Sequence, residues 1–176
     1  LQSRHDFMAF KLRSEASSGV LVKVNRETHF AYLLQPAADL AMHLQEYGLA
    51  AEFYESLLEI QPKNLHAHFG LASIHSVQGD EYDKAIPHYR ALLAAEPENE
   101  SVILNLSTCF ARLYRWEESV EVLKKACQDK QPSVNILIAR SEIYRSRGKL
   151  SNAFNSLHAV RDIYWDDPRF LAAYMH

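Results

Sequence analysis

Bulky and small residues alternate along this chain in a pattern that recurs every 34 or 35 residues. Four small residues, Ala50, Ala85, Ser119 and Ala153, follow one another at intervals of 35, 34 and 34 residues. A bulky residue stands three positions before each of them and another stands four positions after. Residues at such spacings share one face of a helix. The pattern therefore predicts amphipathic helices that repeat at a fixed interval.

A second pattern precedes each of these helices. It reads His68-x-x-Leu71-Ala72-x-x-His75, then Ile103-x-x-Leu106-Ser107-x-x-Phe110, then Leu137-x-x-Arg140-Ser141-x-x-Tyr144. The small residue in the middle of each lets a neighbouring helix approach closely. Gly79 and Gly148 stand where the first helix of a pair must end. Pro62 and Pro97 stand between successive pairs, where a helix cannot continue. Each repeat is therefore predicted to be a helix hairpin.

These motifs resemble the tetratricopeptide repeat family, and residues 65–99 match its pattern best. That pattern is a large residue, Leu followed by a small residue, a Tyr, then Ala-x-x-x-aromatic and a closing Pro. The resemblance implies an all-α solenoid of the α-α superhelix class, in which antiparallel helix pairs stack around a concave peptide-binding face. We predict four hairpins, at residues 31–64, 65–99, 100–133 and 134–167.

The pattern weakens at both ends of this array. The first repeat has small residues where bulk is expected and carries Pro36 inside its first helix, and the last repeat has Arg140 in the expected Leu position. Residues 168–176 are predicted to begin one more helix, which either caps the stack or starts a further repeat of a longer array.

Residues 1–30 are predicted to form an N-terminal arm that is extended or partly disordered. The arm contains the segment Gly19-Val20-Leu21-Val22-Lys23-Val24, whose β-branched valines favour an extended conformation. Three interpretations stay open. The arm is a poorly ordered tail, a packed capping element, or a pseudo-ligand that occupies a groove of its own chain or of a neighbour.

Composition agrees with a helical protein. The 176 residues include only 5 Gly and 6 Pro, about half the usual share, and the scarcity of turn residues argues against an all-β fold. A net charge of −3 gives no electrostatic basis for nucleic-acid binding. No apolar run approaches the roughly 18 residues that would cross a bilayer. With only two cysteines, the chain is predicted to reside in a reducing compartment, the cytoplasm.

The sequence offers little chemistry for catalysis or metal binding. Among nine histidines, His66 and His68 point to different sides of a helix, while His68 and His75 share a face but hold packing positions. No nucleophile or phosphate-loop motif is present. The adjacent acids Glu117-Glu118 and Asp166-Asp167 fall at helix boundaries, where the helix dipole favours them. We therefore expect no enzyme activity, no metal site and no cofactor.

The resemblance implies that function lies on the first helix of each pair. Phe69, Leu104 and Ile138 occupy equivalent positions and form an apolar stripe, which either binds a partner or packs against the facing helix. The predicted peptide-binding groove consists of His66, Phe69, Ser73, Ser101, Leu104, Asn105, Thr108, Arg112, Asn135, Ile138, Glu142 and Arg145.

The leading hypothesis is a non-catalytic scaffold that binds a partner peptide with apolar anchors and serves complex assembly. A clamp for acidic chaperone tails is disfavoured: Asn105 matches that pattern, but its Lys and Arg are missing. The alternatives are a small bacterial secretion chaperone that shields an apolar client segment, a homo-oligomer that assembles through its terminal repeats, and the recruitment module of a longer protein.

Overall fold

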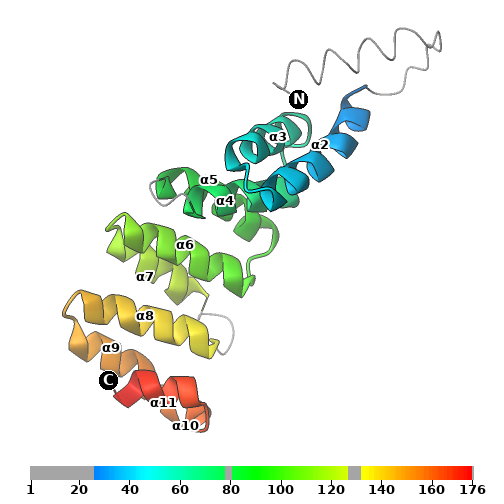
Figure 1. Cartoon of the computed structure of the whole chain (residues 1–176). Helices are drawn as coiled ribbons and strands as arrows, with labels where there is room; N and C mark the ends of the chain where they lie inside the picture. Colours follow the sequence, from blue (N-terminus) through cyan, green and yellow to red (C-terminus); the bar gives the residue numbers. More distant parts are fainter. Residues whose placement is uncertain (1–25, 78–80, 127–131, 176) are drawn as a thin grey trace, which may run out of the picture. The chain divides into compact units, whose positions relative to one another are not determined.

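The structure is a computed structural model that describes residues 26–77, 81–126 and 132–175 (Figure 1). These residues form helices and turns and contain no strand, so the predicted all-α class is confirmed. The helices are α2 (Arg26–His43), α3 (Tyr47–Ile60), α4 (Leu65–Val77), α5 (Tyr82–Ala95), α6 (Glu100–Arg112), α7 (Trp116–Lys125), α8 (Val134–Ser146), α9 (Leu150–His158), α10 (Arg161–Tyr164) and α11 (Pro168–Met175). Gly79 and Cys127, which the sequence singled out, lie outside the described residues.

The chain forms two compact units, Leu1–Gly70 and Leu71–His176. In the first unit, α2 and α3 form a hairpin, with Pro36 inside α2 as expected. Helix α2 begins at Arg26, inside the stretch predicted as an arm, and residues 1–25 lie outside the described residues.

Close helix approach in the first unit depends on glycine. A Cβ atom added to Gly70 on α4 would lie 2.2 Å from a ring atom of Tyr54 on α3. The Tyr54 ring is buried, and its hydroxyl donates a 2.7 Å hydrogen bond to Asp39 on α2. Tyr54, the bulky residue four positions after Ala50 in the repeat pattern, thus joins three helices of this unit.

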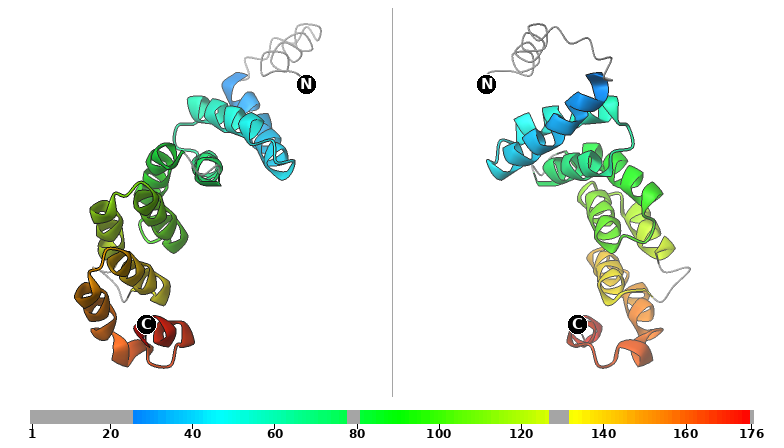
Figure 2. Two further views of the ribbon diagram at one scale, coloured as in Figure 1. Left: turned by 60° about the vertical axis from the view of Figure 1, so that its left-hand side comes forward. Right: turned by 90° about the vertical axis from the view of Figure 1, so that its right-hand side faces the viewer.

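The second unit is built from successive helix pairs. Helices α6 and α8 lie in one layer, and α7 and α9 lie in the other (Figures 1 and 2). The small residues of the repeat, Ala50, Ala85, Ser119 and Ala153, are at most 4% exposed in their respective units. The bulky residues four positions later, Tyr54, Tyr89, Leu123 and Leu157, are at most 3% exposed. The sequence periodicity therefore coincides with the buried faces of the helices.

Polar side chains define several helix ends. Asn64 accepts a hydrogen bond from the Ala67 amide at the start of α4, and Asn99 accepts one from the Val102 amide at the start of α6. The Ser133 hydroxyl accepts a hydrogen bond from the Ile136 amide at the start of α8. Gly148 follows α8 with a φ of 68°, as expected for a left-handed residue that ends a helix.

Helix α11 covers the end of the α8–α9 pair, against which it packs (Figure 2). Phe170 is fully buried there in a cluster with Val134, Leu137 and Leu157. The Tyr164 hydroxyl donates to the Pro132 carbonyl oxygen and ties this region to the start of α8.

Candidate peptide-binding face

Four polar side chains form a continuous exposed stripe along α6. Ser101, Asn105, Thr108 and Arg112 are separated by four, three and four residues, which places them on one helix face. All four are exposed. This stripe is the most regular part of the predicted groove.

Helix α8 presents a matching but more mixed row. Asn135 and Glu142 are exposed, whereas Ile138 and Arg145 are partly buried. Since α6 and α8 lie in the same layer, the two rows belong to one face of the second unit. We refer to this surface as the α6–α8 face.

The two apolar residues of the face contribute to the protein interior. Leu104 packs against the buried cluster that includes Ile103 and Leu123. Ile138 packs against the cluster that contains Phe170. Both side chains are only partly buried, so each also offers part of its surface to solvent. The apolar stripe expected from the sequence is therefore recessed between exposed polar side chains in this unit.

A row of hydrogen bonds connects helices α6, α8 and α11. The Asn135 side-chain amide donates to the Glu100 carboxylate at 2.8 Å, and its carbonyl oxygen accepts from the Arg169 guanidinium at 3.2 Å. Both ends of the Asn135 amide are thus engaged, which fixes its orientation. Arg169, on α11, was missed by sequence reasoning, although it stands 34 residues after Asn135 and so continues the repeat interval.

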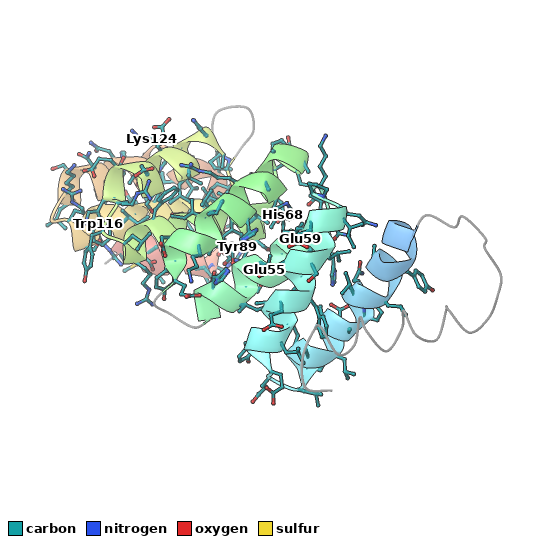
Figure 3. All side chains as sticks on the ribbon, turned by 90° about the horizontal axis from the view of Figure 1, so that it is seen from above. Glu55, Glu59, His68, Tyr89, Trp116 and Lys124 are labelled. Carbon is teal, nitrogen blue, oxygen red and sulfur yellow. The ribbon has the colours of Figure 1, made fainter. Side chains whose placement is uncertain are left out.

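The polar groups on α6 differ in how far they are already satisfied. The Thr108 hydroxyl donates to the Leu104 carbonyl oxygen. Asn105 hydrogen-bonds to the hydroxyl of Tyr89 on α5, which is labelled in Figure 3. Burial raises the pKa of Tyr89, and hydrogen bonds from Ser76 and Asn105 oppose that shift. Arg112 is exposed, and no ion pair of its guanidinium is found among the described residues.

The predicted residues on α4 fall on both sides of the unit boundary. Ser73 belongs to the second unit and is partly buried. His66 and Phe69 belong to the first unit, where the Phe69 ring is 47% exposed. His66 Nε2 lies 2.7 Å from the Asp39 carboxylate. Partial burial acts to raise the pKa of Asp39, but hydrogen bonds from His66 and Tyr54 outweigh it and lower that pKa.

The histidines considered for metal binding have structural contacts. His75 Nδ1 lies 2.7 Å from the Glu81 carboxylate, and the His75 ring stacks on His88. His68 Nε2 lies 3.0 Å from the Pro62 carbonyl oxygen. Across the described part of the chain, no three His, Cys, Asp or Glu side chains gather in a way that could hold a metal ion. Within residues 26–77, 81–126 and 132–175, no helix has the length and apolar composition needed to cross a membrane.

A model of the tetratricopeptide repeat matches residues 36–100 and again residues 69–135, together more than half of the chain. The chain belongs to the tetratricopeptide repeat family. The predicted family is thus confirmed, and the α6–α7 pair lies wholly within the matched residues. A comparison with curated protein sequences found no match.

Solved tetratricopeptide structures share this fold at low sequence identity. A MamA protein is 13% identical with a TM-score of 0.68, covering 84% of this chain and 80% of its own. YrrB, described as a TPR protein with an unusual peptide-binding site, is 20% identical with a TM-score of 0.59, covering 78% of this chain and 70% of its own. PilF of Pseudomonas aeruginosa is 19% identical with a TM-score of 0.59, and the match covers 84% of this chain and 67% of PilF. These similarities show the fold, a helical solenoid of the α-α superhelix class.

Proposed function

We propose that this tetratricopeptide repeat chain is a protein–protein interaction scaffold that binds a peptide segment of a partner on the α6–α8 face. The observation that carries the proposal is the exposed stripe of Ser101, Asn105, Thr108 and Arg112. Four side chains that can hydrogen-bond to a peptide backbone stand in line along a helix that the core holds in place. The family and the fold support the general role of an interaction scaffold.

The recessed residues Leu104 and Ile138 supply the apolar part of this proposed site. A partner side chain that covered their exposed surface would gain about 25 cal/mol per Å² of buried apolar area, before the costs of association. Arg112 would fix the orientation of the bound segment, because a guanidinium group donates in a fixed plane to carboxylate or carbonyl oxygens. We therefore expect an extended partner segment with spaced apolar residues and an acceptor group opposite Arg112.

A displayed library of random peptides about 12 residues long tests the proposal without a known partner. Peptides selected on the wild-type chain should bind Arg112→Ala about tenfold more weakly in calorimetry, the effect of losing a well-placed interface arginine. Lys124→Ala removes a cation from an exposed position on α7 (Figure 3) and is the matched control. Full affinity of the selected peptides for both Arg112→Ala and Asn105→Ala would refute the site, provided circular dichroism shows native helix content.

Self-association is a second candidate function, favoured by the exposed apolar residues of α9 to α11. Leu150, Phe154, Ile163, Trp165 and Met175 are 50 to 81% exposed. Large exposed apolar side chains that gather in one region typically mark an interaction surface. Sedimentation at several concentrations should show a dimer or larger species that Trp165→Glu dissociates and Tyr32→Glu, at an exposed aromatic residue of α2, does not. A monomer at every concentration excludes this function.

A further inference from the structure

A cleft of about 1060 Å³ lies between helices α5 and α7, and residues of α6 and α8 complete its lining. Its floor is apolar: Leu93, Val122 and Ala126 line it as partly buried side chains, above the buried Ile103. Those four residues also belong to, or pack against, the cluster around Leu123. None of the predicted peptide-binding residues, all of which the structure describes, lines this cleft. It is therefore a surface separate from the α6–α8 face.

The rim of the cleft is acidic. Five glutamates line it, Glu98, Glu100, Glu117, Glu118 and Glu121, against two basic residues, Arg90 and Lys125. The first turns of α6 and α7 account for Glu100, Glu117 and Glu118, because acids there are favoured by the helix dipole. Glu121 lies beyond the first turn of α7, so this explanation does not extend to it.

The rim glutamates are not equally neutralised. Glu118 forms a two-pronged ion pair with Arg115, which lowers the pKa of Glu118. Glu117 pairs with Arg147 at 2.6 Å. Glu100 accepts from Asn135, a neutral partner, and its charge also interacts with that of Arg169. Among the described residues, none forms an ion pair with the Glu121 carboxylate. Negative charge thus remains at the rim beside an apolar floor.

One cationic group that lines the cleft already lies against an aromatic ring. The Arg90 guanidinium lies 5.6 Å from the centre of the Phe110 ring, which also lines the cleft. Aromatic faces and carboxylates together stabilise cations. The same environment is suited to a lysine or arginine supplied by a ligand.

We propose that this cleft is a second docking surface, which binds a basic amphipathic segment of a partner protein. Apolar side chains of the segment would cover Leu93 and Val122, and its lysine or arginine side chains would meet Glu121 and Glu100. The proposal commits to a basic partner because the rim is acidic, and complementary charge sets specificity and association rate at such surfaces. It does not depend on peptide binding at the α6–α8 face.

Calorimetry with a synthetic peptide tests this proposal. The peptide is an amphipathic sequence of leucine and lysine about 12 residues long, which is about 18 Å as a helix. Glu121→Lys should weaken binding about tenfold at low salt, where exposed charges interact most strongly. Asp166→Lys makes the same charge change at an exposed residue that does not line the cleft and is the matched control. An equal loss in both variants would mean that only net charge matters and would overturn the proposal, as would an absence of binding to the wild-type chain.

Amide chemical shifts locate the bound peptide independently of the variants. We expect the largest changes at Leu93, Glu121 and Val122, with small changes at Ser101, Asn105 and Arg112. The reverse distribution would assign the peptide to the α6–α8 face and reject the cleft. Because the two surfaces share no residue, failure of one proposal leaves the other testable.

Discussion

Helices in the second unit pack in two different ways, by small residues in its interior and by large aromatic ones at its end. Between α6 and α7, Ser107 and Ser119 are at most 2% exposed. The Ser119 hydroxyl lies 2.8 Å from the Ser107 hydroxyl and 2.7 Å from the Ser107 carbonyl oxygen. At the end of the unit, Phe170 is fully buried and stacks on Tyr174 with 5.9 Å between the ring centres.

The difference shows which changes each contact tolerates. Two serines that touch across a helix pair leave no space for a larger side chain, because protein interiors are close-packed. A large ring that fills the space between three helices leaves a cavity when it is shortened. The interior contact should therefore be sensitive to added volume, and the end of the unit to lost volume.

The largest effect is expected from Phe170→Ala. Deleting a fully buried phenylalanine ring costs about 3–5 kcal/mol, and here the loss falls on the contact that holds α11. Amide hydrogen exchange should accelerate throughout α11 and much less in α6. Phe170→Leu keeps most of the volume and should retain most of the protection. Unchanged exchange in α11 of the alanine variant would show that Phe170 does not anchor this helix.

Ser119→Leu probes the opposite sensitivity at the interior contact. Extra volume at a closed site costs about 1–3 kcal/mol, so the melting temperature should fall. Ser119→Ala removes the hydrogen bonds without adding volume and should cost about 1 kcal/mol. If the two variants are equally stable, close packing of α6 on α7 is not what requires a small residue at this position.

A smaller effect is expected at the turn between α8 and α9, where packing has no part. Gly148 has a φ of 68°, and a Cβ atom added there would meet no atom within 4 Å. Gly148→Ala should therefore cost only the strain of the left-handed conformation, about 1 kcal/mol in chemical denaturation. Gly148→Asn, a residue that tolerates this conformation better, should cost less. A loss as large as that in Ser119→Leu would contradict a purely conformational role.

The sequence predicted those features that depend on position within the repeat. Ser119 and Leu123 could be assigned to buried faces from their spacing alone, and Gly148 to a helix end from its backbone preference. The sequence could not decide whether the Leu104 side chain is exposed or packed, because its partial burial depends on how closely neighbouring helices approach. Arg169 could have been found by continuing the 34-residue interval past the last complete repeat.

The cleft beside Glu121 escaped sequence reasoning for a different reason. Its shape depends on the separation of α5 and α7, which are not consecutive in the chain. Its rim combines residues from several helix ends, each of which has an ordinary local explanation. Only their arrangement around Leu93 and Val122 makes them a candidate site.

The smallest expected effect concerns the polar end of the aromatic contact. Asp167 accepts hydrogen bonds from the Arg169 side chain and from the amides of Arg169 and Phe170 at the start of α11. These bonds, chiefly that from the Arg169 side chain, lower the pKa of Asp167 to about 2 from an ordinary value of 3.8. Because the folded pKa is the lower one, the ionised carboxylate stabilises α11 above pH 3.8, and this contribution disappears as the pH falls towards 2.

Carboxyl-carbon NMR of Asp167 should therefore give a midpoint near 2. Amide exchange in α11 should accelerate over the same acidic range, beyond the change seen in Asp167→Asn. The Asp167→Asn variant keeps an acceptor for the Phe170 amide but cannot ionise, so amide exchange in its α11 should not accelerate over this acidic range. The site is exposed, and added salt should weaken the dependence. A midpoint at the ordinary value would mean that Asp167 does not cap α11, and that Phe170 and Tyr174 hold this helix without polar support.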